Sequence, residues 1–244
     1  MSFADNLREV RARIHAACAA VGHDPACVEL LAVSKTFPAD AVKDAIRAGA
    51  HAFGENYVQE GVTKILALAS ERNTSATPVT WHFIGPLQSN KTREVAEHFD
   101  WMHSVDREKI AQRLSDQRPV SLPPLRICLQ VNVSGEASKS GVAPDAVAAL
   151  AKAVTAMPRL RLRGLMAIPE PTDDERLQRE RFRALATLFQ TIRSQLSDPD
   201  QAAFDTLSMG MSGDLESAIA ESLPNVTTMV RVGTALFGQR AAKA

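Results

Sequence analysis

The segment VELLAVSKTFPADAVKDAIRAGAHAFG, residues 28–54, reads as one complete strand–helix–strand unit. A short apolar run predicts a strand at 28–34, charged residues with helical spacing predict a helix at 38–48, and a brief run predicts the next strand at 51–54. Pro38 stands where this helix should begin, because proline is favoured in the first helical turn. Strands that alternate with helices pair in parallel through right-handed crossovers. The unit therefore predicts an α/β protein built on a parallel sheet.

The same alternation continues along the chain. Further apolar runs rich in Val, Ile, Leu and Phe predict strands at 80–85, 101–105, 125–133, 162–168, 204–210 and 228–233. The charged stretches between these runs predict helices at 56–70, 90–98, 106–117, 144–156, 173–196 and 212–222. About eight strand–helix units in about 250 residues are typical of a closed (β/α)8 TIM barrel. An open, doubly wound sheet is the competing architecture.

The amphipathic N-terminal segment precedes the first strand. Residues 3–21 predict an extra helix, which we expect to pack outside the strand–helix repeat. No long linker interrupts the rest of the sequence. Residues 1–244 are therefore expected to form a single barrel domain.

Composition narrows the classes of function. The chain has 28 Lys and Arg against 28 Asp and Glu, and this balance argues against a general nucleic-acid binder or an anionic membrane surface as partner. No stretch approaches the roughly 20 apolar residues of a membrane-spanning helix. Cys18, Cys27 and Cys128 lack the spacing of metal ligands, so we expect no metal site. The sequence predicts a soluble, cytoplasmic protein.

Lys35 is the first candidate for chemistry. It follows a strand that is apolar on both faces, and in a parallel barrel functional groups collect on the loops after the strands. Burial of an amine disfavours its charged form, which leaves more of the neutral nucleophile that attacks carbonyl groups. The alternative is a lysine that simply extends from the strand end into water.

Two loops near the end of the chain suggest a phosphate site. Ser212 and Gly213 precede a predicted helix, and Gly233 and Thr234 follow the last predicted strand. Loops after strands seven and eight of a barrel commonly hold a phosphate group through backbone N–H groups and hydroxyls. The alternative is ordinary turn and capping chemistry, since Ser212 with Glu216 nearby resembles a helix N-cap.

Other polar residues lie within or just after the predicted strands. Arg231 interrupts an apolar strand and must point into a site or pair with a carboxylate. His82 and His103 are candidates too, although a histidine in a strand is more often a core residue with satisfied hydrogen bonds. Asn56 can donate and accept in a pocket, or cap a helix. A lysine and a phosphate cradle at one barrel mouth would suit a phosphorylated aldehyde, either pyridoxal 5′-phosphate (PLP) or a sugar phosphate.

Eight segments together resemble one known family. LLAVSKTFP, FGENYVQE, WHFIGPLQSNK, HSVD, VNVSGEASKSG, GLMAI, LSMGMSGDLESAI and VRVGTALFG, in this order, are similar to the pyridoxal phosphate homeostasis proteins, over about residues 28–240. The resemblance implies a single PLP-binding domain like the N-terminal domain of alanine racemase, a fold-type III PLP protein. It implies PLP as cofactor.

The resemblance also assigns roles to residues. Lys35 matches the lysine that holds PLP as a Schiff base, and Arg231 matches the arginine that faces the pyridine nitrogen. The phosphate-binding segments of the family match Ser208, Ser212, Gly233 and Thr234. Positions that line the cofactor match Asn56, His82 and Met209.

The function that the resemblance implies is intracellular PLP homeostasis without robust turnover, so no catalytic residue is assigned. The expected partners are PLP-dependent apo-enzymes, and the protein is expected to be a monomer, with a dimer as the alternative. The alternative is a PLP-dependent amino-acid racemase, but racemases of this kind use a tyrosine as second base, and the only tyrosine here is Tyr57. A third hypothesis is a Schiff-base aldolase that acts on a sugar phosphate without PLP.

Overall fold

The computed structural model describes residues 2–73, 77–134 and 140–238 and contains a closed barrel of parallel strands. The strands follow one another around the barrel in chain order, as β1 (Val28–Val33), β2 (Ala52–Glu55), β3 (Thr80–Phe83), β4 (Trp101–Val105), β5 (Leu125–Gln130), β6 (Leu160–Met166), β7 (Thr206–Met211) and β8 (Thr227–Val232). The barrel closes where β1 pairs with β8, with Leu31 opposite Arg231. The predicted (β/α)8 barrel is confirmed, and the open sheet is excluded.

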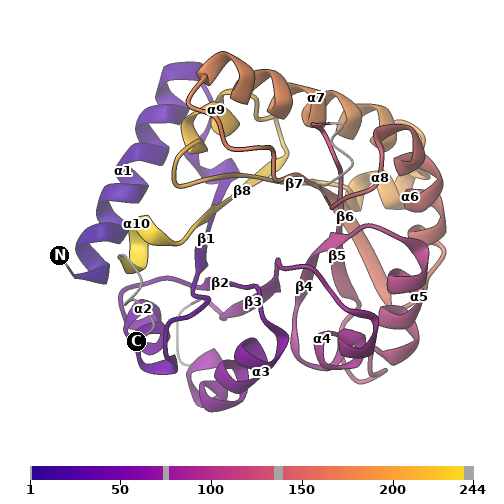
Figure 1. Ribbon diagram of the computed structural model, residues 1–244, viewed down its shortest axis with the longest axis horizontal. Coiled ribbons are helices and arrows are strands. Elements are labelled where there is room, and N and C mark those ends of the chain that lie inside the picture. Colours follow the sequence, from indigo (N-terminus) through magenta and orange to yellow (C-terminus); the bar gives the residue numbers. More distant parts are fainter. Residues whose placement is uncertain (1, 74–76, 135–139, 239–244) are drawn as a thin grey trace.

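Helices surround the barrel, as Figure 1 shows. In chain order the α-helices are α1 (Phe3–Val21), α2 (Ala39–Arg47), α3 (Val58–Ala67), α4 (Thr92–His98), α5 (Glu108–Gln117), α6 (Val147–Thr155), α7 (Glu175–Arg193), α8 (Asp198–Ala203), α9 (Leu215–Ala220) and α10 (Thr234–Phe237). Short 3-10 helices are η1 (Pro25–Cys27), η2 (Ala69–Asn73), η3 (Ser89–Lys91) and η4 (Pro144–Ala146). The two short helices α8 and α10 were not expected from the sequence.

The extra N-terminal helix lies where the sequence predicts it. Ser2 caps α1 with a reciprocal pair of hydrogen bonds to Asp5, and Gly22 ends the helix in a left-handed conformation. Its buried stripe consists of Leu7, Val10, Ile14 and Cys18. This stripe joins the main hydrophobic cluster, and α1 lies beside α9 and α10 (Figure 1). The helix therefore packs against the elements that follow the last two strands.

Several element boundaries differ from those predicted. Strand β6 begins at Leu160 rather than at residue 162, because the exposed Arg161 interrupts the apolar pattern at its start. Helix α9 begins at Leu215, three residues later than expected, which leaves Ser212 in a loop. That difference decides the geometry of the candidate site.

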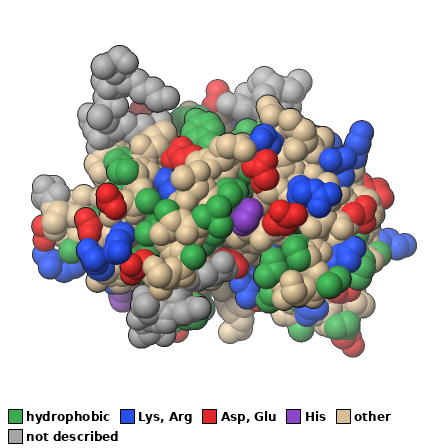
Figure 2. Space-filling view, turned by 90° about the horizontal axis from the view of Figure 1, so that it is seen from below, with side chains coloured by type: hydrophobic (Ala, Val, Ile, Leu, Met, Phe, Trp, Pro, Cys, Tyr) green, Lys and Arg blue, Asp and Glu red, His purple; other side chains and the backbone are tan. Residues whose placement is uncertain are grey.

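The surface carries mixed charges. On the face in Figure 2, Lys and Arg side chains are interspersed with Asp and Glu side chains. In the described part of the chain, no helix combines the length and apolar character needed to cross a membrane. All three cysteines are free thiols.

Candidate functional site

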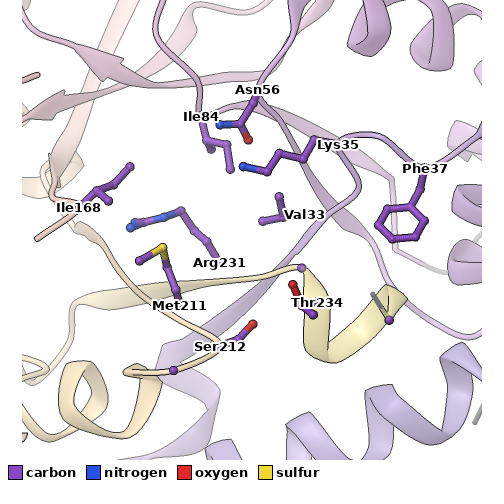
Figure 3. Close-up of a pocket in the computed structure, with 13 residues that line it drawn as sticks. Val33, Lys35, Phe37, Asn56, Ile84, Ile168, Met211, Ser212, Arg231 and Thr234 are labelled. Atoms are coloured by element: carbon purple, nitrogen blue, oxygen red, sulfur yellow. The ribbon is translucent and has the colours of Figure 1, made fainter. Parts of the chain in front are cut away.

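A cavity of about 320 Å³ opens at the carboxyl end of the barrel strands. Its volume falls within the range of small-molecule sites, roughly 300–1,000 Å³. It is lined by Val33, Lys35, Phe37, Asn56, Ile84, Ile168, Met211, Ser212, Gly213, Arg231, Gly233, Thr234 and Gly238. Lys35 and Asn56 enter from one side and Ser212 and Thr234 from the opposite side, with Arg231 reaching in from a third direction (Figure 3). The predicted lysine and the two predicted phosphate loops therefore share one cavity.

Lys35 sits on a tight turn directly after β1. The backbone N–H of Phe37 donates to the carbonyl oxygen of Ser34 at 3.0 Å, which closes the turn. Thr36, next to Lys35, has a φ of +71°, in the left-handed region that β-branched residues avoid. The side chain of Lys35 lines the cavity and is half-buried, so it does not simply extend into bulk water.

Asn56 follows β2 and lines the same cavity. The N-cap of α3 is Tyr57, so Asn56 is not the cap of this helix. A Cβ at Gly85 would lie 2.7 Å from the Cα of Asn56, so only glycine allows this approach of the two backbones. Among the described residues, the buried Oδ1 of Asn56 has no hydrogen-bond partner. The cavity wall thus presents an acceptor that a ligand could satisfy.

The opposite wall comes from the loops after β7 and β8. Because Asp214 is the N-cap of α9, Ser212 is not a helix cap, and it lines the cavity beside Gly213. Gly233 and Thr234 follow β8 and complete this wall. Hydroxyls next to glycines, with backbone N–H groups accessible, are the usual surroundings of a bound phosphate.

The N-terminal helix braces this wall. Arg13 on α1 donates from Nη2 to the carbonyl oxygen of Ser212 at 3.0 Å, and its Nε and Nη2 pair with the two carboxylate oxygens of Glu216 on α9. Asn6 donates from Nδ2 to the carbonyl oxygen of Leu236 at 2.8 Å. The helix that stands outside the barrel repeat therefore contacts the loop after β7 and the short helix α10 that follows β8.

Arg231 on β8 is a buried cation at the cavity. Its Nη1 donates to Ser208 Oγ at 2.8 Å and its Nη2 donates to the carbonyl oxygen of Ala167 at 2.9 Å. Both of these acceptors are neutral, and no ion pair to Arg231 occurs among the described residues. Burial lowers the pKa of the guanidinium to about 10, so it keeps its charge at neutral pH.

A chain of hydrogen bonds runs from Arg231 into the barrel. Ser208 Oγ lies 2.8 Å from His103 Nδ1, His103 Nε2 lies 2.9 Å from His82 Nδ1, and His82 Nε2 lies 3.0 Å from Thr80 Oγ1. Burial lowers the pKa of His103 to about 3 and that of His82 well below its usual value. Because Arg231 can only donate, Ser208 accepts from it and can donate its hydroxyl proton to His103 Nδ1. If both histidines are neutral and protonated on Nε2, His103 donates to His82 and His82 donates to Thr80, so every contact has one donor and one acceptor.

Three residues that the resemblance assigns to the cofactor are not among the described residues that line the cavity. Ser208 lies beneath Arg231, and His82 lies deeper in the barrel, where it behaves as a core histidine with satisfied hydrogen bonds. Met209 is buried in the main hydrophobic cluster, and Met211 lines the cavity instead. For Met209 the physical reason is a register irregularity in β7 between Ser208 and Met211, which breaks the regular alternation of side chains.

A second cavity of about 660 Å³ adjoins the first at Asn56. Tyr57 lines this second cavity and is 56% exposed. Among the described residues that line the Lys35 cavity, the only ionisable side chains are Lys35 and Arg231. The chain's one tyrosine therefore stands beside the site and not on its wall.

Comparisons with known proteins agree with this architecture. The sequence model described as "Alanine racemase, N-terminal domain" matches residues 2–241. A pyridoxal phosphate homeostasis protein of Pseudomonas aeruginosa is 58% identical over 239 residues, which are 98% of this chain and 96% of the relative. The protein of the same name from Escherichia coli K12 is 52% identical over 237 residues, 97% of this chain and 96% of the relative.

A solved structure shares this fold over nearly the whole chain. The structure of PipY of Synechococcus elongatus with PLP bound superimposes with a TM-score of 0.80 at 34% identity, and the match covers 97% of this chain and all of PipY. Sequence and structure thus agree along nearly the whole chain. The chain belongs to the alanine racemase N-terminal domain family and, within it, to the pyridoxal phosphate homeostasis proteins.

Proposed function

We propose that this chain binds PLP in the Lys35 cavity and serves in intracellular PLP homeostasis, with Lys35 as the anchoring amine. PLP supplies an aldehyde that forms a reversible Schiff base with a primary amine. Lys35 Nζ adds to the aldehyde carbon, and water leaves as the C=N bond forms. The observation that carries the proposal is that Lys35 and the two loops with Ser212 and Thr234 line one cavity.

The groups on the cavity wall fit such a ligand. Ser212, Gly213, Gly233 and Thr234 offer hydroxyls and close backbone approach for a phosphate group. The unpartnered Oδ1 of Asn56 would accept a hydrogen bond from a donor on the bound molecule. Similar relatives bear the name pyridoxal phosphate homeostasis protein, and PipY was solved with PLP bound.

Arg231 has a separate role in the proposal. A guanidinium that faces the pyridine nitrogen keeps that nitrogen unprotonated, because a second positive charge beside it is unfavourable. Its hydrogen bonds to Ser208 and to the Ala167 carbonyl hold it in place. In this way Ser208 acts behind Arg231 rather than on the phosphate, and His82 and His103 support it from further inside.

We propose that the protein holds and releases PLP without robust turnover. An unprotonated ring nitrogen makes the cofactor a weaker electron sink, so carbanion chemistry is less assisted. The described wall of the cavity has Lys35 as its only potential base, and Tyr57 lies on the neighbouring cavity. A racemase that uses two bases would need a second one on this wall.

The partners and the compartment follow from this role. We propose that one barrel domain, as a monomer in the cytoplasm, passes PLP to apo-enzymes that require it. An open cavity at the mouth of the barrel supports transfer, and three free thiols are typical of a reducing compartment.

The proposal is tested by titrating the purified protein and its Lys35→Ala variant with PLP. We expect a visible absorption band from the Schiff base in the wild type and none of it in the variant. Pyridoxine 5′-phosphate, which carries an alcohol in place of the aldehyde, should bind both proteins with affinities within about threefold of each other. A variant that kept both the band and the affinity for PLP would refute Lys35 as the anchor.

Two further measurements separate the alternatives. Incubation of the PLP-loaded protein with L- and D-amino acids in deuterated water reports racemase chemistry, since a racemase exchanges the α-hydrogen and scrambles its configuration. We expect no such exchange. A purified protein that stays colourless with added PLP, and that reacts with a sugar phosphate under borohydride, would favour the aldolase.

A further inference from the structure

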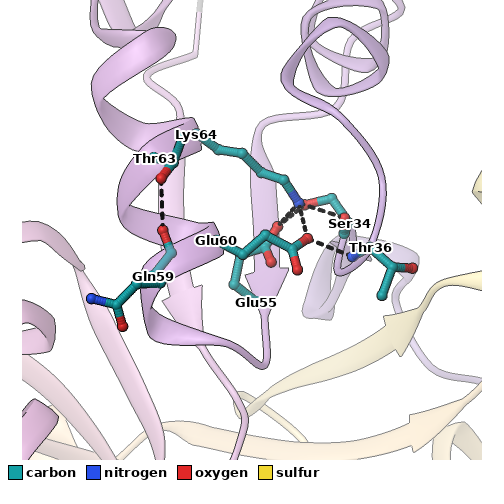
Figure 4. Close-up of polar contacts among 7 residues, drawn as sticks. All are labelled: Ser34, Thr36, Glu55, Gln59, Glu60, Thr63 and Lys64. Atoms are coloured by element: carbon teal, nitrogen blue, oxygen red, sulfur yellow. Dashed lines mark hydrogen bonds and ion pairs between the residues drawn. The ribbon is translucent and has the colours of Figure 1, made fainter.

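A buried ammonium group lies directly behind the turn that carries Lys35. Lys64 projects from α3, and its side chain is only 4% exposed. Its Nζ donates to the carbonyl oxygen of Ser34 at 2.7 Å, to Glu55 Oε1 at 2.8 Å and to Glu60 Oε1 at 2.7 Å (Figure 4). All three donors of the ammonium therefore find acceptors, and one acceptor is the residue just before Lys35.

The residue just after Lys35 is tied to the same ammonium through one carboxylate. Glu60 Oε1 accepts the backbone N–H of Thr36 at 2.5 Å as well as the bond from Lys64 (Figure 4). Ser34 Oγ donates to Glu55 Oε1 at 2.6 Å, which adds a third link between the turn and this cluster. Lys64 thus fixes the chain on both sides of Lys35.

The turn needs such support. Thr36 occupies the third position of a turn closed by the Ser34–Phe37 hydrogen bond, with a φ of +71°. Glycine or asparagine is usual where this position has a positive φ, and a β-branched residue there is strained. Strained backbone persists only when surrounding contacts hold it, and it concentrates where function depends on geometry.

We infer that Lys64 is a positioning residue, which holds the turn 34–37 so that Lys35 points into the cavity with its amine ready to react. The inference rests on the proposed function, because the readiness of Lys35 matters only if Lys35 is the anchor. Lys64 does not line the cavity among its described residues, so it acts on the ligand only through Lys35 and its turn.

Lys64→Met tests the inference because methionine keeps an unbranched side chain, one atom shorter than that of lysine, and removes the charge and the donors. The matched control is Lys43→Met, since Lys43 is also a helical lysine paired with a glutamate, Glu71, at 2.7 Å, but lies away from the cavity. In the apo protein, hydrogen–deuterium exchange of a peptide that contains Thr36 and Phe37 should be at least about tenfold faster in Lys64→Met than in the wild type, and unchanged in Lys43→Met.

The reaction with PLP supplies the second readout. We expect the rate of Schiff-base formation, followed by visible absorption, to fall at least about tenfold in Lys64→Met. Affinity for pyridoxine 5′-phosphate should stay within about threefold of the wild type, since this ligand needs no reacting amine. A rate within twofold of the wild type, or a parallel loss of pyridoxine 5′-phosphate binding, would overturn the positioning role.

A second variant covers the case in which Lys64→Met does not fold. Glu60→Ala removes the acceptor of the Thr36 N–H but leaves Lys64 Nζ bonded to the Ser34 carbonyl oxygen and to Glu55. The protein should tolerate this change, because the Glu60 side chain is 29% exposed. It should show the same two effects at about threefold or more, and their absence would overturn the inference. If the wild type itself forms no Schiff base, the proposed function fails and the inference fails with it. If the wild type reacts and both variants react as fast, only the inference fails.

Discussion

Arg13 and Ser212 lie 199 positions apart in the chain, and Arg13 Nη2 donates to the Ser212 carbonyl oxygen at 3.0 Å. Since the same guanidinium also pairs with Glu216 on α9, the N-terminal helix fixes the Ser212 loop on the cavity wall, which we propose holds the phosphate group. This contact gives the extra helix a function beyond covering the barrel.

Arg13→Ala should therefore weaken ligand binding more than it weakens the fold. We expect affinity for pyridoxine 5′-phosphate to fall about three- to tenfold, because the Ser212 loop loses its brace. The control is Arg8→Ala on the same helix, since Arg8 is 77% exposed and pairs with Asp5 of α1 itself. Calorimetric titration of both variants checks this, and equal affinities in the two would contradict it.

Ser208→Ala should destabilise the apo protein by about 1–3 kcal/mol, because Arg231 Nη1 and His103 Nδ1 both lose a buried partner. Urea unfolding measures the effect. Ser217→Ala is the control, since Ser217 is also buried but makes one hydrogen bond to Gln178, whose loss costs about 1 kcal/mol. A Ser208 variant as stable as the wild type would show that the chain of bonds behind Arg231 contributes nothing.

The buried histidines predict an acid sensitivity. The folded-state pKa of His103 is about 3 and that of His82 is also depressed, both mainly by burial, against an ordinary value of 6.5. The unfolded chain therefore binds more protons as the pH falls below about 6.5. Stability should be full above that pH and should decline toward pH 3, by up to about 1.4 kcal/mol per pH unit for each histidine.

Urea unfolding at a series of pH values measures this slope in the apo protein. His103→Gln should make the slope shallower, because one of the two depressed groups is gone, whatever its effect on absolute stability. His15→Gln is the matched control, since it makes the same substitution at an exposed position on α1. A wild-type stability that is flat between pH 6.5 and 4 would contradict the prediction.

Gly85→Ala should disturb the site through Asn56. The added Cβ would lie 2.7 Å from the Asn56 Cα, so the backbone must shift, at a cost of about 1–3 kcal/mol. We expect a lower melting temperature together with weaker binding of pyridoxine 5′-phosphate. Gly213→Ala is the control for stability, since a Cβ there meets no described atom within 4 Å. A Gly85→Ala variant with the melting temperature and the pyridoxine 5′-phosphate affinity of the wild type would show that the Gly85 and Asn56 backbones have room for a methyl group between them.

The sequence predicted the barrel well because most residues of the strands are buried, on both faces of the sheet. Such strands appear as short, unbroken apolar runs, and all eight runs became strands with boundaries shifted by at most a few residues. The predicted residues that sit just after strands, Lys35, Asn56, Ser212 and Thr234, all line one cavity, because the topology of a parallel barrel gathers them at one mouth.

Positions within a strand were harder to place. Met209 and Met211 differ by two residues, so regular alternation would give them the same orientation, yet one is in the core and the other on the cavity. The irregularity in β7, with Gly210 at a φ of +86°, separates them. Nothing in a single sequence shows where such an irregularity falls.

Helical charges that support the site were missed. The sequence-based predictions included neither Lys64 nor Arg13, although Lys64 lies three residues after the buried Gly61 and next to the buried Ile65. That spacing is a usable signal, because a lysine on the buried face of a helix needs carboxylates within reach. Here Glu55 and Glu60 provide them.

The central claim is that Lys35 is the amine that binds PLP. The most direct measurement is borohydride reduction of the PLP-loaded protein, followed by mass mapping of the modified lysine. The account predicts a single pyridoxyl-phosphate adduct on Lys35, lost in Lys35→Ala but kept in Lys43→Met. Attachment mainly at another lysine, or an equal yield of adduct in the Lys35→Ala variant, would contradict it.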